Sequence, residues 1–354
     1  MDSYEIIDLS GAPKWNDYFK KLPIDQQDTY YTPEYYKLYE ELGDGKARCF
    51  IYRKDRSIAI YPFLINSVNE LGYDLDKEYY DIQGAYGYNG VVTNNYSDSF
   101  SLGFHESFKQ YCIDFNIIAE FTRFHPLLNN KSFSESYIEV IFDRKTMYVD
   151  LNNEFVEIFR NFQTTTRKQI RRAQNRYNIE VKYFTKDESA LNTFVDIYNE
   201  TMKRINSAPY LYFNKTYFKT LFENPNNYCF IAYYKNKPIA AIITLYSNNY
   251  NHGHLGGSLT NYLFVAPYSL LYSEIIKFGI SKGCRYFHAG GGKTSHSDDS
   301  LLNFKANFSK DRGDFYIGKK IHNEKIYNYV INKWENKFQE KIINKRNMLL
   351  RYRL

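Results

Sequence analysis

One lysine lies inside an apolar and aromatic stretch late in the chain. Lys305 belongs to the segment Leu301-Leu302-Asn303-Phe304-Lys305, and Phe308 follows three residues later. A lysine framed in this way can reach a cleft, where its charge would stabilise a developing oxyanion or a phosphate. A surface lysine whose methylene stem covers apolar neighbours gives the same pattern, so the sequence leaves both roles open.

Glycine-rich segments precede this lysine at two places where strands are expected to end. They are HLGGS at residues 254–258 and HAGGGKTSHSDDS at residues 288–300. Glycines at strand ends let a ligand approach the backbone closely, which makes Gly291 and Gly292 candidates for binding an acyl donor.

The second segment also carries two histidines and two adjacent acids. His288 and His296 have no third partner at metal-ligand spacing, so structural roles are favoured and no metal site is predicted. Asp298 and Asp299 are possible general bases, although deprotonating an amine near neutral pH does not require a strong one.

Positive charge is concentrated in TTTRKQIRRAQNRY, residues 164–177, where threonines able to cap a helix precede the basic residues. Arg167 and Arg171 share a helix face and could bind phosphates of a nucleotide-linked substrate or of tRNA. A solvated face paired with acids is the alternative. Arg204, at a predicted helix end before Ala208-Pro209-Tyr210, can bind an anion bidentately or cap backbone carbonyls.

The elements that position these residues occur twice along the chain. A helix around residues 35–37, a strand at 49–51, a polar turn and a strand at 58–64 recur at residues 217–219, 229–231 and 239–245. In each half a Gly-rich segment and a helix then lead to a further strand, at residues 116–121 and 284–288. A strand, a helix and a parallel strand form the crossover unit of α/β proteins.

We therefore expect an α/β (α+β) chain with two tandem domains, each a mixed sheet flanked by helices. A length of 354 residues suits two domains of ordinary size. The expected boundaries are residues 1–150 and 151–321, followed by a basic helical segment, 322–354, packed on the domains.

Composition and charge narrow the class of protein. The net charge of +6 permits a phosphate-rich ligand without requiring a nucleic acid, and no DNA partner is predicted. The four cysteines lie in apolar contexts without metal-ligand spacing, as in reduced cytoplasmic proteins. No signal-peptide pattern or run of transmembrane length is found, so a cytoplasmic location is expected.

The ordered motifs resemble the FemABX-like branch of the GNAT acyltransferase superfamily. They are R-x-x-I-R-R-A from Arg167, Y-x-x-T-M-x-R from Tyr198, Y-F-x-x-L from Tyr217, H-L-G-G-S from His254, G-G-G-x-x-S-x-x-D-D-S-L from Gly290, F-K-x-x-F from Phe304, and, in the N-terminal half, A-Y-G-Y-N-G from Ala85 and R-F-H-P-L-L-x-N from Arg123. The resemblance implies two tandem GNAT-like domains and the formation of amide bonds.

The same resemblance implies roles for particular residues. Lys37 and Arg204 correspond to the basic pair that holds the diphosphate of a precursor, and Tyr262 to an aromatic contact with that substrate. Phe304 and Lys305 correspond to the pair at the donor's acyl end, where Lys305 would stabilise charge at the reacting carbonyl.

Two departures from the family pattern affect the donor. The turn that normally binds the pyrophosphate of coenzyme A is here Ala266-Pro267-Tyr268-Ser269. It has no glycines, and Pro267 supplies no N–H group. The basic helix also runs directly into the strand at residues 179–181, without the long helical arm of some Fem proteins. Basic surfaces would have to make any tRNA contact.

The resemblance implies an acyltransferase that moves an aminoacyl or acyl group to an amine of a nucleotide- or lipid-linked cell-wall or cell-surface precursor. The donor would be aminoacyl-tRNA or acyl-CoA, with no tightly bound cofactor. One alternative is an acyl-CoA-dependent N-acetyltransferase that acts on an amino sugar in surface polysaccharide biosynthesis. Another is a GNAT-like module that binds a glycan or RNA without chemistry.

Overall fold

The structure is a computed structural model of the chain, and it describes residues 2–296 and 298–354. The chain forms two compact units: unit 1 comprises Met1–Asp143 and Phe315–Leu354, and unit 2 comprises Arg144–Asp314. These limits differ from the expected boundaries at residues 150 and 321. The C-terminal segment and the strand before it both belong to unit 1.

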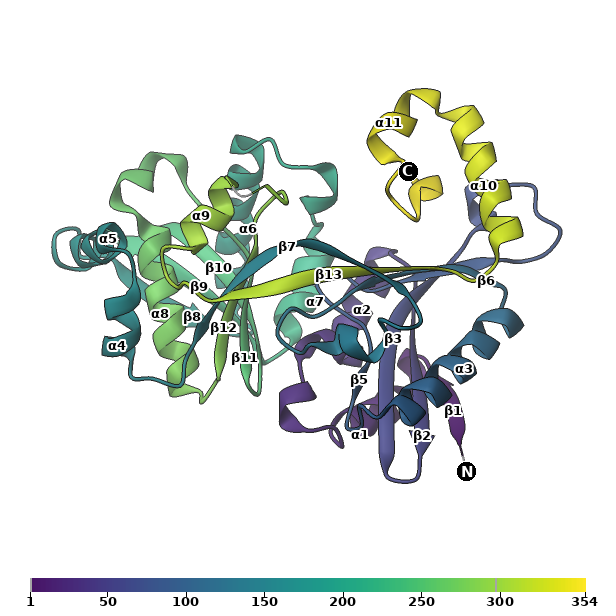
Figure 1. Cartoon of the computed structure of the whole chain (residues 1–354). Helices are drawn as coiled ribbons and strands as arrows, with labels where there is room; N and C mark the ends of the chain where they lie inside the picture. Colours follow the sequence, from purple (N-terminus) through teal and green to yellow (C-terminus); the bar gives the residue numbers. More distant parts are fainter. Residues whose placement is uncertain (1, 297) are drawn as a thin grey trace. The chain divides into compact units, whose positions relative to one another are not determined.

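Unit 1 contains a mixed sheet with strands in the order β1-β2-β3-β4-β6-β13 (Figure 1). Its strands are β1 (Ser3–Ile7), β2 (Lys46–Lys54), β3 (Ser57–Ser67), β4 (Tyr80–Gln83), β6 (Ile117–Arg123) and β13 (Arg312–Ile321), and β5 (Val92–Thr93) pairs with β3. Its α-helices are α1 (Ala12–Phe19), α2 (Pro33–Leu42), α3 (Asp98–Asp114), α10 (Glu324–Lys337) and α11 (Ile342–Lys345). β4 and β6 are parallel, and α3 connects them as the expected crossover helix.

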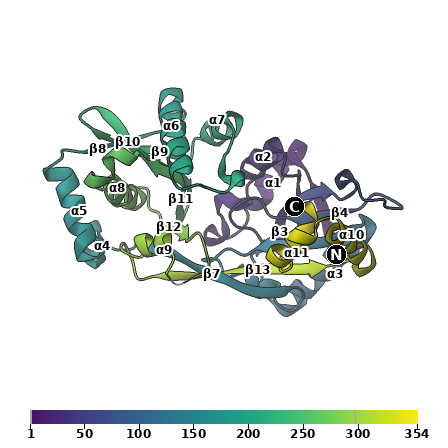
Figure 2. The same cartoon turned by 90° about the horizontal axis from the view of Figure 1, so that it is seen from above.

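The strands of unit 1 alternate their side chains between two helical layers. Phe50, Tyr52, Tyr61 and Phe63 point to the same face and pack on α3 in a fully buried aromatic core. α1 and α2 lie on the opposite face (Figures 1 and 2). α2 has clear end signals, because the side chain of Thr32 caps its first turn and Gly43 ends it with a φ of 91°.

The C-terminal segment is anchored in unit 1 by a buried ion pair. The side chain of Asp81 on β4 is fully buried, and its Oδ2 accepts hydrogen bonds from Tyr352 Oη and Arg353 Nε, both at 2.7 Å. Trp334 of α10 packs into the same cluster. The basic tail is therefore an integral part of this unit.

The strands of unit 2 follow the order β7-β12-β11-β10-β9-β8 and are likewise mixed in direction. Its strands are β7 (Glu139–Asp150), β8 (Glu180–Phe184), β9 (Asn227–Tyr234), β10 (Lys237–Ser247), β11 (Tyr250–Ser258) and β12 (Tyr286–Gly291). Its α-helices are α4 (Phe155–Asn161), α5 (Thr164–Asn175), α6 (Glu188–Arg204), α7 (Lys215–Glu223), α8 (Pro267–Ser281) and α9 (Ser300–Lys305). β11 and β12 are parallel, with α8 as their crossover helix.

The core of unit 2 lies between the sheet and α8, which packs in turn on α4 and α5. α8 is apolar on most of its surface, as expected of a helix covered on several sides: Leu271, Ile275 and Ile276 are fully buried. α6 and α7 cover the other face of this sheet (Figure 2).

The predicted repeat is confirmed, and the structure adds an exchange of strands. Each unit follows the order helix, antiparallel hairpin, parallel crossover, with α2, β2 and β3 matching α7, β9 and β10. The strand beside the crossover strand comes from the other half of the sequence in both cases. β7 follows unit 1's crossover but pairs with β12 in unit 2, whereas β13 follows unit 2's crossover and pairs with β6 in unit 1.

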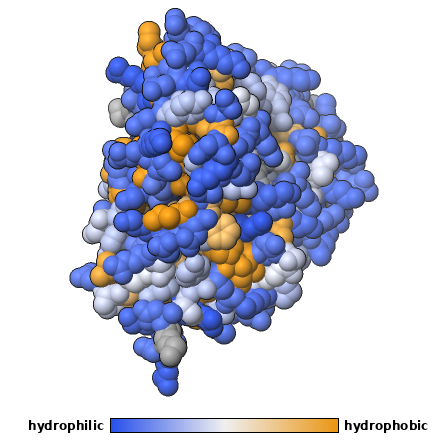
Figure 3. Space-filling view, turned by 90° about the vertical axis from the view of Figure 1, so that its right-hand side faces the viewer, coloured by the Kyte–Doolittle hydropathy of each residue, from blue (hydrophilic) through white to orange (hydrophobic). Residues whose placement is uncertain are grey.

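Apolar side chains are concentrated in these cores. On the face of the molecule in Figure 3 they are interspersed among polar ones. None of the helices in the described part of the chain is long and apolar enough to cross a membrane. The four cysteines are buried and unpaired, as predicted.

Candidate acyl-transfer site

Lys305 lies in the last turn of a short helix whose start is fixed by Asp299. α9 begins at Ser300, and Asp299 Oδ1 accepts hydrogen bonds from the amides of Leu301 and Leu302, both at 2.9 Å. An acidic N-cap of this kind satisfies amides that have no partner within the helix. The cap determines where the helix starts and therefore where Lys305 lies.

The Lys305 side chain is buried and points at the glycine-rich end of β12. Only 8% of the residue is exposed, and Nζ donates a hydrogen bond of 2.6 Å to the carbonyl of Gly291. Burial lowers the pKa of this ammonium from its ordinary value near 10.5 to about 8. An ammonium carries three N–H bonds, so two remain beyond the one donated to Gly291.

The loop between β12 and α9 is held by hydrogen bonds to Oδ2, the second carboxylate oxygen of Asp299. Asp299 Oδ2 accepts hydrogen bonds from the amides of Lys293 and Thr294 at 2.9 Å and from Thr294 Oγ1 at 3.1 Å. Burial alone would raise the pKa of Asp299, but these hydrogen bonds and those from α9 outweigh it and lower the pKa to about 2. So weak a base, occupied in holding the loop, is poorly suited to taking a proton, and a general-base role for Asp299 stays a prediction.

The two glycines predicted for donor binding lie in this loop. A Cβ on Gly292 would fall 2.4 Å from Asp299 Oδ1, so only glycine allows the carboxylate to approach. Arg144 Nη1 donates to the carbonyl of Gly292 at 3.1 Å, and its side chain also contacts Gly291. Packing within the protein thus explains both glycines, and the prediction that a donor contacts them remains a prediction.

Phe304 is half-buried beside the lysine. Its ring lies 5.7 Å from that of Tyr272 and 6.1 Å from that of Tyr268, both on α8, and 5.6 Å from Phe308. This aromatic group fixes α9 against α8.

Arg204 contacts the end of β11, and Tyr262 lies in the segment that follows this strand. Arg204 Nη1 donates to the carbonyl of Ser258 at 2.6 Å and to Thr260 Oγ1 at 3.1 Å, so the arginine does interact with backbone carbonyl groups. Tyr262 follows within the 3-10 helix Thr260–Val265, where the Lys237 ammonium lies 5.2 Å from its ring centre.

The glycines of HLGGS serve close packing. A Cβ on Gly257 would lie 2.3 Å from Thr201 Oγ1 of α6, and one on Gly256 would lie 2.1 Å from the Tyr268 hydroxyl. The missing side chain at Gly257 lets α6 approach β11 closely, and the one at Gly256 makes room for Tyr268 of α8.

The basic helix is α5, and its charged residues have local partners. Arg167 donates to the carbonyl of Arg160 and to Thr164 Oγ1, both at 3.0 Å, and the Arg171 guanidinium lies 5.6 Å from the Phe159 ring. The threonines do not cap this helix as predicted, since they lie inside its first turn and Gln163 occupies the cap without a side-chain bond.

The start of α8 has the unusual geometry that the sequence indicates. Pro267 is the first helical residue, and Ala266 before it adopts the left-handed conformation with φ and ψ of 50°. A non-glycine residue there is strained by about 1–2 kcal/mol. The prolyl nitrogen removes one of the amides that a pyrophosphate group would otherwise meet at a helix start.

Lys37 belongs to unit 1, unlike the other predicted residues. It lies on α2, its side chain is 53% exposed, and Nζ is 3.5 Å from Glu41 Oε1 one turn later. The pairing is a surface i,i+4 contact and contributes little to stability.

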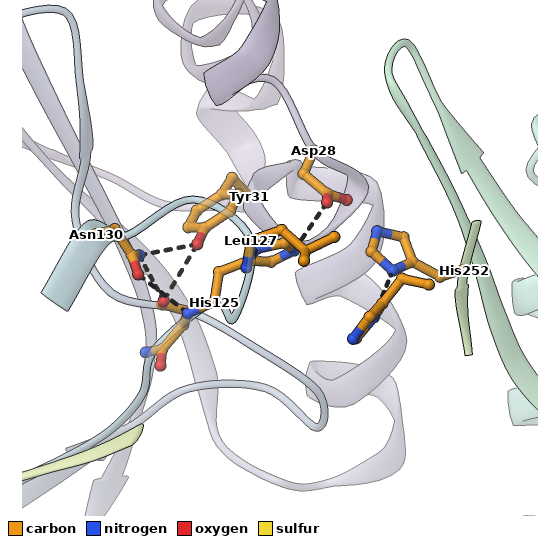
Figure 4. A network of polar contacts seen from close by, with 8 residues as sticks. Asp28, Tyr31, His125, Leu127, Asn130 and His252 are labelled. Carbon is orange, nitrogen blue, oxygen red and sulfur yellow. Dashed lines mark hydrogen bonds and ion pairs between the residues drawn. The ribbon is translucent and has the colours of Figure 1, made fainter. Parts of the chain in front are cut away.

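Unit 1 has a buried polar network that joins its two Fem-like motifs (Figure 4). Asn130 Nδ2 donates to the carbonyl of Asn89 at 2.9 Å and to the Tyr31 hydroxyl at 3.0 Å. His125 Nδ1 accepts from the amide of Leu127 at 3.1 Å, and Nε2 lies 3.0 Å from Asp28 Oδ2. Asp28 was not among the predicted site residues, because no motif marks its segment.

Unit 2 has a histidine pair that was also missed. Nδ1 of His252 and Nδ1 of His288 lie 3.2 Å apart in neighbouring strands, so a proton on one can be donated to the other (Figure 4). His254 contacts the Tyr217 hydroxyl at 2.9 Å, and burial lowers its pKa to about 3. The alternation of residues 252 and 254 on a strand was the available signal.

Comparison with known proteins identifies the fold. Residues 160–305 match the family model described as an acetyltransferase (GNAT) domain. The crystal structure of FemX superposes with a TM-score of 0.68 at 12% identity and covers 92% of this chain and 99% of FemX. L-PGS from Bacillus licheniformis gives 0.56 at 12% identity, with coverages of 87% and 91%.

A tandem GNAT protein from the clavulanic acid biosynthesis pathway gives a TM-score of 0.50 at 7% identity, covering 90% of this chain and 98% of that one. No curated protein sequence matches the chain significantly. Most of unit 2 therefore matches an acetyltransferase (GNAT) domain, and the predicted tandem GNAT-like fold, similar to that of FemX, is confirmed.

Proposed function

We propose that the protein transfers an aminoacyl group from an activated ester, aminoacyl-tRNA, to an amine of a cell-envelope precursor. The observation that carries this proposal is the buried Lys305 ammonium. It lies in the last turn of α9 and donates a hydrogen bond to the Gly291 carbonyl. An unpaired charge in such a position destabilises a fold, which favours a functional role over a structural one.

The reaction needs few protein groups. The acceptor amine attacks the donor carbonyl carbon, and a C–N bond forms while the carbonyl oxygen becomes an oxyanion. Lys305 would donate a hydrogen bond to that oxyanion. The C–O bond to the donor ribose then breaks, and the departing hydroxyl takes the proton that the amine releases.

The choice of an ester donor rests on the start of α8. Pro267 and the strained Ala266 replace the glycines and amides that bind pyrophosphate in ordinary GNAT domains. The similarity in fold to FemX and L-PGS supports an envelope substrate. An acyl-CoA donor is the competing possibility, since the matching family model describes acetyltransferases.

Transfer of radiolabelled amino acid from aminoacyl-tRNA to UDP-linked muropeptides tests the proposal, with acetyl-CoA and amino sugars as the parallel assay. We expect turnover with the first pair and a loss of about 100-fold or more in Lys305→Ala without a drop in melting temperature. Turnover with acetyl-CoA alone would replace the proposed donor, and unchanged turnover in Lys305→Ala would refute the proposed role of the lysine.

A further inference from the structure

Unit 1 contains a cavity that acyl transfer in unit 2 does not use. It has a volume of about 480 Å³ and lies between α3, the strands β3, β6 and β13, and the segment 134–138. Small-molecule sites in proteins have volumes of roughly 300–1,000 Å³, with apolar walls and a few polar groups. Each wall and each polar group of this cavity comes from unit 1.

A buried carboxylate, that of Glu120 on β6, lines this cavity. The residue is 7% exposed, its Oε1 accepts from the Tyr61 hydroxyl at 2.7 Å, and its Oε2 lies 3.0 Å from His322 Nε2. Burial alone would raise the pKa of Glu120, but the hydrogen bonds from His322 and Tyr61 outweigh it and the pKa is lowered. The carboxylate is therefore charged, and it has lone pairs left because it can accept about four hydrogen bonds.

A second acceptor is present on α3. His105 Nε2 lies 3.0 Å from the carbonyl of Phe133, and because a carbonyl only accepts, Nε2 carries the proton. Burial lowers the pKa of His105 to about 4, so the ring is neutral near pH 7 and its Nδ1 accepts hydrogen bonds.

Besides His105 and Glu120, the lining has the acidic or basic side chains of Glu106, Lys109, Lys320 and His322, and the last of these is paired with Glu120. Glu106 and Lys109 are exposed and opposite in sign, and Lys320 donates to the carbonyl of Tyr137 at 2.7 Å. Phe104, Phe108 and the Tyr137 ring, which is stacked on His105 at 4.1 Å, supply aromatic surface. Acceptors and aromatic faces together favour an organic cation.

We propose that this cavity binds a small protonated amine, with its ammonium group on Glu120 and its apolar body against Phe104 and Phe108. A free amine and an amino acid both present this chemistry. The inference is independent of the function proposed for unit 2.

Isothermal titration calorimetry on the intact chain at pH 7 tests this proposal with three probes that share a phenyl ring on a short chain and differ in their charged groups. Phenethylamine has the ammonium group alone, L-phenylalanine has both charged groups, and 3-phenylpropionate has the carboxylate alone. We expect phenethylamine to bind and 3-phenylpropionate to give no heat of binding. Binding of L-phenylalanine as well would identify the natural ligand as an amino acid, and its failure to bind would identify a free amine.

Two variants locate the site. Glu120→Gln should weaken phenethylamine at least tenfold, whereas the matched change Glu106→Gln at the exposed rim should not alter it. If Glu120→Gln does not fold, Ser136→Trp decides, because Ser136 is an exposed lining residue and a tryptophan there would block the cavity. The proposal would be overturned if the carboxylate probe bound as well as phenethylamine, or if neither amine bound at millimolar concentration. Unchanged affinity in Ser136→Trp would overturn it too.

Discussion

Lys305→Met tests whether the buried ammonium destabilises the fold in return for a function. With a pKa of about 8 when folded and 10.5 when unfolded, the charge opposes folding by about 3 kcal/mol at pH 7, about 2 at pH 9 and less than about 1 at pH 10. The sign follows from proton binding: between these pKa values the unfolded chain binds more protons, so raising the pH stabilises the folded wild type.

Methionine has a similar length and no charge, but it leaves the Gly291 carbonyl without its donor, which costs about 1 kcal/mol or more. The variant should therefore be about 1–2 kcal/mol more stable than wild type at pH 7 and less stable at pH 10. At roughly 2–4 °C per kcal/mol for a unit of this size, its melting temperature should rise by about 2–8 °C at pH 7.

Differential scanning calorimetry from pH 6 to pH 10 measures this crossover. Lys310→Met is the matched control, because Lys310 is exposed and its removal should shift the curve equally at every pH. Parallel curves for Lys305→Met and wild type, with the variant less stable throughout, would refute the reasoning. They would mean that the lysine stabilises the fold through its hydrogen bond.

Asp299→Ala should lower the free energy of unfolding by about 2 kcal/mol through the lost cap and loop contacts, and should reduce acyl transfer, whereas Asp298→Ala at the exposed neighbour should do neither. Arg353→Met should cost about 3 kcal/mol in urea unfolding, because it leaves Asp81 buried without its ion partner, and adding Asp81→Asn should recover part of the loss. Ala266→Gly should raise stability by up to about 1 kcal/mol, since glycine relieves the left-handed strain but adds entropy to the unfolded chain; a lower melting temperature would contradict this.

Local patterns were sufficient to predict much of the fold. The hairpins at β2–β3 and β9–β10 have alternating apolar residues around a polar turn, and α8 has a proline at its start, so these elements are encoded within short windows. The strand exchange could not be predicted in this way. The pairing of β13 with β6 joins residues almost 200 positions apart, and the local sequence of a strand does not specify a partner so far away.

In the candidate site, too, local patterns identified some residues and not others. Phe304 and Lys305 were identified because a charge in an apolar helix is locally anomalous. Asp299 was considered only as a possible base, although an acid directly before a short helix is also an N-cap signal, and the structure places it at that cap. His252 and Asp28 were missed, because buried polar partners are recognisable only once the segments around them are folded.

The division of unit 1 into two pieces of sequence has a consequence for synthesis on the ribosome. Roughly 170 residues separate its first piece from β13, so at ordinary elongation rates β6 waits about 10 to 30 s for its neighbour. The strands β7 to β12 all emerge before β13 and can pair with one another first. The nascent protein thus carries an open strand edge beside an aromatic core until its last residues emerge, and the cell must protect that edge from other chains during this interval.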